Sequence, residues 1–298
     1  FKKILHSIFS LMSINKKVII KIILIILLCT FFTLPIIVYG KYPFLFSSNK
    51  KNVIILGYHH FVTLEEKKNH FSSNGNVISV DKFEEQLKYL KRKKYNPITI
   101  DELYCWLNNE CEIPEKSILI TIDDGNLSTY KYALPLLEKY NFNGVSFVIT
   151  SRIRQTTNEW VDGKLVFMGR DIIEDIEDNH KNLVIASHTH NLHRKINDLY
   201  PKDVLSLEEL KEDLVMSKKI LNTDYFAYPF GSYDEKYITA LDNSGYKMAF
   251  TYGPFRSATK NDSILTVPRI SVPGDISMLK FKMYLKDIRY HGFCILDA

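Results

Sequence analysis

The sequence of 298 residues predicts an α/β fold in which helices wrap a parallel sheet, with the sheet closed as a barrel. Two observations support this prediction. From Val53 onward, short runs rich in β-branched and aromatic residues alternate with segments of helical period, which is typical of parallel strands linked by helices. The length also suits a single α/β barrel with one large core, and 46% apolar and 24% charged residues are ordinary for a globular protein.

An apolar run precedes this fold. Residues 22–39 carry no charge, and these eighteen residues are just enough to cross a bilayer as a helix. Five lysines come before the run, so the positive-inside rule places everything after it outside the cytoplasm. We therefore expect a basic cytoplasmic segment at 1–21, one transmembrane helix within 22–40 and a linker at 41–52. A signal segment that is cleaved after Gly40 is the alternative, and it would make the protein secreted.

The charge and the cysteines exclude two other classes. Because those five lysines equal the whole net charge of +5, nothing indicates a nucleic-acid face. Cys105 and Cys111 could pair outside the cell, but together with Cys294 they form no disulfide framework and no metal knuckle. We interpret them as structural or incidental.

Seven short apolar runs are the predicted strands, and they lie at 53–56, 118–122, 145–149, 183–186, 225–228, 248–251 and 266–270. The helices between them carry their own signals. We expect capping boxes at Asp81 with Glu84 and at Ser206 with Glu209, each followed by an apolar stripe. A third helix over 234–244 should end at Gly245, which suits a left-handed cap.

A long loop is predicted at 151–166, where no clear period is present. Trp160 in this loop could stack on a ligand or could simply pack as an ordinary indole.

Polar residues follow three of the predicted strands directly. Asp123 and Asp124 end one of them, His59 and His60 follow the first strand, and a third segment contains His188, His190 and His193. The carboxyl ends of parallel strands open on one face of a barrel, so these side chains should converge there. Two adjacent carboxylates after a buried strand cost several kcal/mol unless a cation compensates them. One aspartate with two neutral imidazoles is a suitable ligand set for a catalytic divalent metal.

Three short motifs give the chain a resemblance to a known family. Residues 121–125 read Thr-Ile-Asp-Asp-Gly and resemble the Thr-Phe-Asp-Asp-Gly motif of the polysaccharide deacetylase (NodB-homology) family. Residues 187–189 together with His193 resemble the second motif of that family, and residues 226–231 resemble the third. The resemblance covers about residues 53–272. It implies an irregular parallel (β/α) barrel of the polysaccharide deacetylase type, with a catalytic domain at 53–298.

The resemblance also implies roles for individual residues. Asp124, His188 and His193 would bind a divalent metal, for which zinc is expected. Asp123 would be the general base, and the backbone N–H of Phe230 would help to hold the oxyanion.

Two positions depart from the usual pattern. The arginine that begins the third motif in many members is Ala227 here, and the late motif with a histidine is not visible. Arg269 could replace the arginine, and His59 could replace the histidine as the acid that protonates the leaving amine. His60 and His190 would then be supporting or exposed residues.

The five-residue step from His188 to His193 and the early Tyr58-His59 pair are similar to the branch of extracellular poly-N-acetylglucosamine deacetylases. We therefore expect metal-dependent removal of N-acetyl groups from an N-acetylglucosamine-containing surface polysaccharide, outside the cytoplasm and at the membrane. Peptidoglycan or chitooligosaccharide deacetylation is an alternative, and so is a non-catalytic carbohydrate-binding relative. The expected partners are the N-acetylated polysaccharide and the membrane, with no nucleic acid; the glycan and the oligomeric state are left open.

Overall fold

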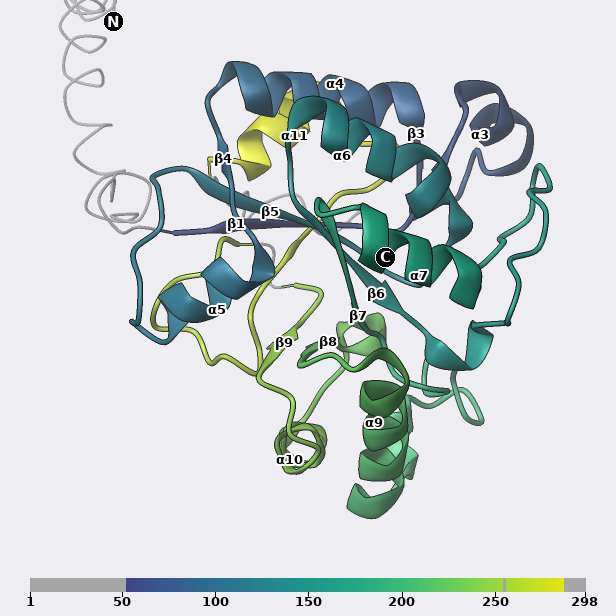
Figure 1. The fold of residues 1–298 in the computed structure, drawn as a ribbon, viewed down its shortest axis with the longest axis vertical. Coiled ribbons are helices and arrows are strands. Elements are labelled where there is room, and N and C mark those ends of the chain that lie inside the picture. The colour runs from purple at the N-terminus through teal and green to yellow at the C-terminus, as the bar shows by residue number, and fades with distance from the viewer. Residues whose placement is uncertain (1–51, 254–255, 287–298) are drawn as a thin grey trace, which may run out of the picture. The chain divides into compact units, whose positions relative to one another are not determined.

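The computed structural model describes residues 52–253 and 256–286 (Figure 1). The expected cytoplasmic segment, apolar run and linker lie outside these residues, apart from Asn52. Within the described part of the chain, no helix is both long and apolar enough to cross a membrane.

An eight-stranded sheet forms the centre of the domain, and every pair in it is parallel. The order along the sheet is β10-β1-β5-β6-β7-β8-β9, and the short β4 pairs with the start of β5. The strands are β1 (Ile54–Tyr58), β4 (Asn96–Pro97), β5 (Ser117–Ile122), β6 (Gly144–Val148), β7 (Leu183–Ser187), β8 (Tyr225–Ala227), β9 (Met248–Phe250) and β10 (Ile270–Ser271).

One segment joins the two edges of this sheet. Val267 forms a parallel bridge with Phe250 of β9, and three residues later Ile270 pairs with Leu56 of β1. The residues 267–271 therefore contact both edge strands. This arrangement confirms the predicted α/β class with a parallel sheet that forms a half-barrel, and it is consistent with the predicted (β/α) barrel.

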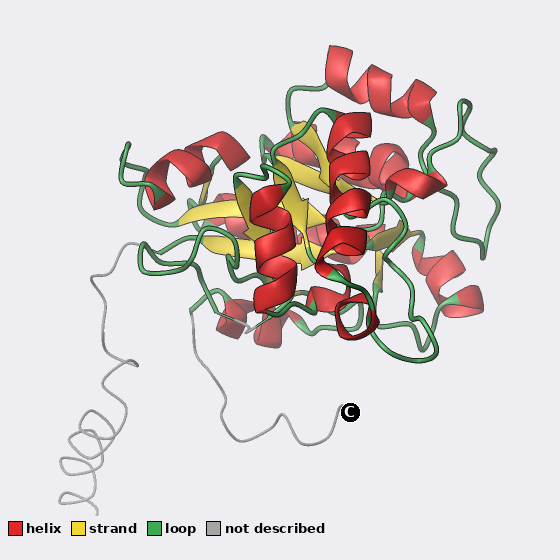
Figure 2. Cartoon of the chain, turned by 90° about the horizontal axis from the view of Figure 1, so that it is seen from below, coloured by secondary structure: helices red, strands yellow, loops and turns green. Residues whose placement is uncertain are grey.

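Helices cover the sheet on its outside (Figure 2). They are α3 (Leu64–His70), α4 (Val80–Arg92), α5 (Ile100–Leu107), α6 (Leu134–Tyr140), α7 (Arg170–Asn179), α8 (Pro201–Val204), α9 (Leu207–Leu221), α10 (Glu235–Asn243) and α11 (Met278–Tyr284). A second, two-stranded parallel sheet pairs β2 (His60–Val62) with β3 (Val77–Ser79).

Side chains alternate between the two faces of the sheet, and each face has its own apolar cluster. Ile54 and Ile118 belong to the apolar cluster that includes residues of α4, α6 and α7. Their neighbours Ile55 and Leu119 enter a different cluster, which includes Trp106 and other residues of α5. Successive side chains of a strand point to opposite faces, so both faces of the sheet are apolar, as a covered parallel sheet requires.

The predicted strands are confirmed in place, with two corrections to their extent. Tyr58 lies within β1 and His60 begins β2, so only His59 lies between two strands. The expected strand at 266–270 is reduced to β10 and the single bridge at Val267, because the segment passes from one edge strand to the other.

The helix signals were partly right. The capping box at Ser206 and Glu209 is confirmed, and Gly245 after α10 has a left-handed φ of 75°. The expected box at Asp81 and Glu84 is wrong, because the side chain of Ser79 caps α4 and Asp81 lies inside the first turn. A cap two residues earlier leaves Asp81 to interact favourably with the positive end of the helix.

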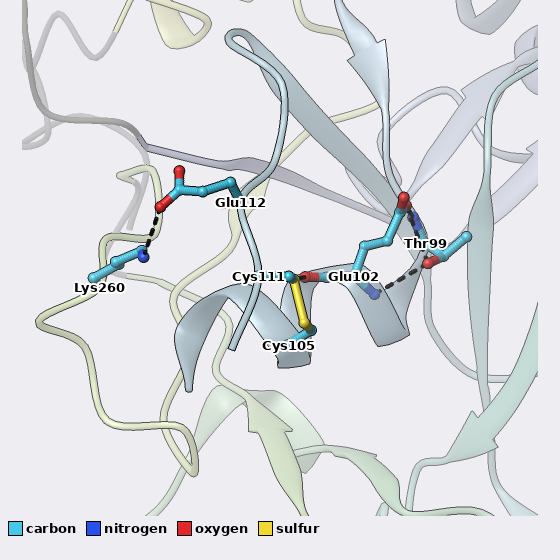
Figure 3. The surroundings of a disulfide bond; sticks show 6 residues. All are labelled: Thr99, Glu102, Cys105, Cys111, Glu112 and Lys260. Carbon is cyan, nitrogen blue, oxygen red and sulfur yellow. Dashed lines mark hydrogen bonds and ion pairs between the residues drawn. A yellow bond between two sulfur atoms is a disulfide. The ribbon is translucent and has the colours of Figure 1, made fainter. Parts of the chain in front are cut away.

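A disulfide joins Cys105 of α5 to Cys111 in the segment that leads to β5 (Figure 3). The loop it closes spans a sequence separation of six residues. Because β5 begins only at Ser117, the disulfide lies toward the amino ends of the strands, away from the face where the polar motifs gather.

Candidate active site

The carboxyl end of β5 turns sharply, and this turn positions the paired aspartates. Asp124 and Gly125 both adopt left-handed backbone angles, with φ of 75° and 73°. A Cβ atom on Gly125 would lie 2.8 Å from the side chain of Val148, so the turn requires glycine at this position. Asp123 is buried, whereas Asp124 is directed toward the histidines that follow β7.

Two histidines meet the carboxylate of Asp124. Its Oδ1 atom lies 3.4 Å from Nε2 of His193 and 3.8 Å from Nε2 of His188. His188 donates from Nδ1 to the backbone oxygen of Ala227 at 2.7 Å, which directs the Nε2 lone pair toward Asp124. Burial lowers the pKa of His188 to about 4 and also lowers the pKa of His193. Both imidazoles are therefore neutral near pH 7, as metal ligands must be.

These three residues fit a divalent metal. One ligand atom from each of Asp124, His188 and His193 lies within 4.8 Å of the other two. Among the described residues, the buried Oδ1 atom of Asp124 has no hydrogen-bond partner. An unpartnered buried carboxylate oxygen is costly, and a bound cation would remove that cost. A His-His-Asp set with open positions is the type used by catalytic metals such as zinc.

Asp123 is held by a distant arginine. Arg269 donates from Nη1 to Oδ1 of Asp123 at 2.7 Å and from Nη2 to Oδ2 at 2.9 Å. The guanidinium also donates to the hydroxyl of Thr121 and to the backbone oxygen of Thr251, so its position is fixed. Burial raises the pKa of Asp123, but the charge of Arg269 and the proximity of His188 outweigh burial, and the net pKa lies below its ordinary value. Asp123 is thus an ionised, oriented acceptor.

His59 and Phe230 lie at the same end of the sheet as the aspartates. The ring of His59 contacts Tyr252 edge to face, with 5.1 Å between centroids and 3.4 Å between Nδ1 and the phenol oxygen. Phe230 has a left-handed φ of 59°, and its ring lies 4.4 Å from that of His193 and 5.4 Å from that of Tyr200. With 43% of its surface exposed, Phe230 forms an aromatic wall beside the candidate ligand His193.

Two other histidines, His60 and His190, lie outside the group of candidate metal ligands. His190 bonds through Nδ1 to the hydroxyl of Thr150 at 2.9 Å. His60 is buried, with Nδ1 at 2.8 Å from the hydroxyl of Ser128, and burial lowers its pKa to about 4. Neither contact reaches Asp124, His188 or His193, and the expected supporting or exposed role of the two histidines stays a prediction.

Trp160 packs as an indole between protein groups. Its ring stacks on His60 with 5.9 Å between centroids, and the ammonium of Lys131 lies 4.3 Å from the centroid of the Trp160 ring. These contacts are those of a packed indole, and stacking of Trp160 on a ligand stays a prediction. Sequence reasoning missed Asp213, whose carboxylate accepts two backbone N–H groups of the loop between the candidate ligands His188 and His193. A single charged residue on an amphipathic helix carries no signal that distinguishes it from a solvated one.

Comparisons with known proteins agree with this geometry. Residues 111–249 match the family model described as polysaccharide deacetylase. The chain is 27% identical over 228 residues to the putative polysaccharide deacetylase YxkH of Bacillus subtilis, covering 74% of this chain and 75% of that protein. It is 26% identical over 238 residues to the poly-beta-1,6-N-acetyl-D-glucosamine N-deacetylase of Staphylococcus aureus, covering 75% and 76% of the two chains.

Solved structures share the fold. The structure of IcaB from Ammonifex degensii matches with a TM-score of 0.65 and 25% identity, covering 79% of this chain and 97% of that one. A de-N-acetylase from Aggregatibacter actinomycetemcomitans matches in fold with a TM-score of 0.67 and 21% identity, covering 78% and 99%. The motifs, the fold and the matched family model agree, and we conclude that residues 111–249 belong to a domain of the polysaccharide deacetylase family, a family of carbohydrate N-deacetylases and therefore of hydrolases.

Proposed function

We propose that this protein is a metal-dependent N-deacetylase that removes acetyl groups from an N-acetylglucosamine-containing surface polysaccharide. The observation that carries the proposal is the juxtaposition of two sets of groups: the ligand trio Asp124, His188 and His193, and beside it the ionised Asp123 held by Arg269. Hydrolysis of an amide needs both an activated nucleophile and a stabilised oxyanion.

The chain's own residues suit each proton transfer. A divalent metal held by the trio would supply Lewis-acid activation of water and of the acetyl carbonyl. Asp123 takes a proton from the attacking water at its carboxylate, since Arg269 keeps it ionised. The backbone N–H of Phe230 stabilises the oxyanion. His59 gives a proton to the amine nitrogen as the C–N bond breaks, so the products are acetate and a free amine.

Arg269 weakens the case for a non-catalytic carbohydrate-binding relative. That alternative is supported by two departures from the family pattern: the missing arginine of the third motif, where this chain has Ala227, and the missing late histidine. Arg269 supplies an arginine to the carboxylate of Asp123 from another part of the chain. A protein that only binds a glycan would have no need for an oriented, ionised base beside a metal ligand.

The S. aureus relative supports the choice of substrate. That protein is named a poly-beta-1,6-N-acetyl-D-glucosamine N-deacetylase, and it aligns with about three quarters of this chain. The exposed ring of Phe230 and the nearby ring of Tyr200 offer apolar faces of the kind on which a sugar ring packs.

A turnover assay tests the proposal. The full chain is incubated with short oligomers of β-1,6-linked N-acetylglucosamine, of chitooligosaccharide and of peptidoglycan, and released acetate is measured with and without a chelator. Chelator-sensitive acetate release, fastest from the β-1,6-linked oligomer, is expected. Glycan binding without acetate release in the metal-loaded protein would support the non-catalytic alternative instead. Faster release from either other glycan would change the assigned substrate.

We also propose that the domain acts outside the cytoplasm and remains at the membrane through the segment 22–40. The lysine-flanked apolar run supports the anchor, and the disulfide between Cys105 and Cys111 supports an oxidising compartment. Protease treatment of intact cells followed by fractionation tests both parts. Full protection from protease would contradict the orientation, and a soluble product that begins at Lys41 would contradict the anchor.

A further inference from the structure

The loop between the two candidate histidine ligands has an unusual backbone. The chain leaves β7 at Ser187 and reaches His193 within six residues. On the way, Thr189 adopts a left-handed φ of 74°, which costs a β-branched residue roughly 1–3 kcal/mol unless its surroundings enforce it. The hydroxyl of Thr189 accepts the N–H of Leu192 at 3.0 Å, which tightens the turn.

One carboxylate from another helix holds this loop. Asp213 of α9 accepts the backbone N–H of His190 at 2.8 Å through Oδ1 and that of Asn191 at 2.7 Å through Oδ2. Hydrogen bonds from two consecutive amides to one charged group are stronger than bonds between neutral groups, and they fix the orientation of the peptide planes. Asp213 touches neither His188 nor His193 through any contact found in the described residues.

The helix that carries Asp213 is itself fastened to β7. Ser217, one helical turn later, bonds through its hydroxyl to the hydroxyl of Ser187 at 2.6 Å. Tyr246 donates to the same Ser187 hydroxyl at 2.8 Å, and it also lies 3.2 Å from the backbone oxygen of Leu214. Residues four apart lie on one face of a helix. Ser217 therefore contacts the end of β7, while Asp213 on the same face binds the loop that follows it.

The opposite side of the loop is fixed by the segment after β6. The N–H of Thr150 bonds to the oxygen of Thr189 at 3.1 Å, and that of Ser151 bonds to the oxygen of His190 at 3.0 Å. The loop is therefore held from two directions. On the α9 side, the backbone N–H groups of His190 and Asn191 both donate to one side chain, that of Asp213.

From this geometry we propose that Asp213 is a positioning residue of the deacetylase: it fixes the spacing between His188 and His193 and thereby sets the affinity and the coordination geometry of the metal site. The inference rests on the proposed function, because it requires the trio to bind a metal. Groups that orient metal ligands from outside typically contribute about 10- to 100-fold to metal affinity.

The test compares Asp213→Asn with Glu212→Gln in the full chain. Asn has nearly the shape of Asp, but it replaces one acceptor by an NH₂ group that faces a backbone N–H. Glu212 is the exposed neighbour on the same helix and serves as the control. Zn²⁺ affinity is measured by competition with a chelating dye, the visible absorption spectrum is recorded with Co²⁺, and the melting temperature is measured without metal.

We expect Asp213→Asn to weaken Zn²⁺ binding by about 10- to 100-fold and to change the Co²⁺ spectrum, while Glu212→Gln matches the wild type. Wild-type affinity and spectrum in Asp213→Asn would overturn the inference. So would a lower melting temperature with unchanged affinity and spectrum, since that result describes a purely structural residue. If Asp213→Asn does not fold, Asp213→Glu takes its place, and the same two outcomes apply.

The failures of the two proposals are distinguishable. If the wild-type chain binds neither Zn²⁺ nor Co²⁺, the metal site and the role of Asp213 are both wrong. If the wild-type chain binds metal and releases acetate, but Asp213→Asn behaves as the control does, only the role of Asp213 is wrong.

Discussion

Arg269 and Asp123 form a buried two-point ion pair, with their nitrogen and oxygen atoms 2.7 and 2.9 Å apart, although 146 positions separate them in the sequence. The guanidinium carbon also lies 5.4 Å from the ring centroid of Phe147 and 5.3 Å from that of Tyr252. The pair therefore fixes both the charge and the direction of the carboxylate that we assign as the base.

Replacement of Arg269 by lysine should distinguish the effect of the positive charge beside Asp123 from the effect of the two-point contact that orients its carboxylate. Lysine keeps the positive charge but cannot make the two parallel bonds, so we expect kcat to fall roughly tenfold to a hundredfold. The melting temperature should also fall, because disruption of a buried ion pair leaves charge incompletely compensated. Arg154→Lys, at an exposed position of the 151–166 loop, is the control. Wild-type kcat in Arg269→Lys would show that the two-point contact is not needed for turnover.

Asp123→Asn tests the assignment of the base. Asn keeps the size of Asp and part of its hydrogen bonding but cannot take a proton, so turnover should fall by roughly a hundredfold or more while metal stays bound. Metal content, melting temperature and acetate release are measured on one preparation. Near-normal turnover at full metal loading would reject the assignment, and activity that simply follows folded fraction would indicate a structural role.

Removal of either histidine ligand should release the metal. His188→Ala and His193→Ala are each expected to lose most bound metal while the barrel stays folded, because the apolar clusters lie elsewhere in the domain. His190→Ala is the control, since its contact with Asp213 uses only the backbone. Metal retained by His193→Ala and lost by His190→Ala would show that the ligand was wrongly chosen.

The buried histidines predict how stability depends on pH. Burial lowers the pKa of His60 and of His188 from 6.5 to about 4, so between these pH values the unfolded chain binds more protons than the folded one. The free energy of unfolding of the metal-free protein should therefore decrease as pH falls from about 6.5 to about 4.

Each such histidine contributes up to about 1.4 kcal/mol per pH unit to this slope. His60→Gln removes one of these groups without touching the metal ligands, so urea unfolding across this pH range should show a flatter dependence. His70→Gln, at an exposed position, controls for loss of an imidazole. A slope in His60→Gln equal to that of the wild type would mean that His60 is not neutral in the folded protein.

The disulfide should stabilise the fold without affecting catalysis. For the short loop between Cys105 and Cys111, loss of the bond should lower the free energy of unfolding by about 2 kcal/mol. We expect a reductant to lower the melting temperature of the wild type but not that of the Cys105→Ser/Cys111→Ser double variant. Acetate release should be unchanged in both, because the bond lies toward the opposite end of the strands from the candidate active site. A reductant-insensitive wild type would contradict the bond.

The sequence predicts the main strands and the clustering of Asp124, His188 and His193 well for one physical reason. Strands covered on both faces appear as continuous apolar runs, and the charged groups that interrupt them, such as Asp123 and His188, stand out at the strand ends. The parallel order then brings those ends together without further information.

Contacts between distant segments carry no such local signal. Arg269 pairs with Asp123, and Asp213 holds the loop at His190, only because the fold brings together residues that are far apart in the sequence. The predicted N-cap of α4 is wrong for a related reason. Ser79 and Asp81 are equally good cap residues in isolation, and the structure places the cap at Ser79 because β3 ends there.

The segment 267–271 both bridges the edges of the sheet and carries Arg269. A nascent or damaged chain in which this stretch has not docked would leave the Asp123 carboxylate buried without its cation, a state that favours a neutral, protonated acid over a proton acceptor. Docking of this segment therefore completes the contacts at the sheet edges and brings Arg269 to Asp123 in the same step. On the proposed function, a partly folded molecule would hold the candidate metal ligands but would lack the ionised Asp123 that deacetylation requires.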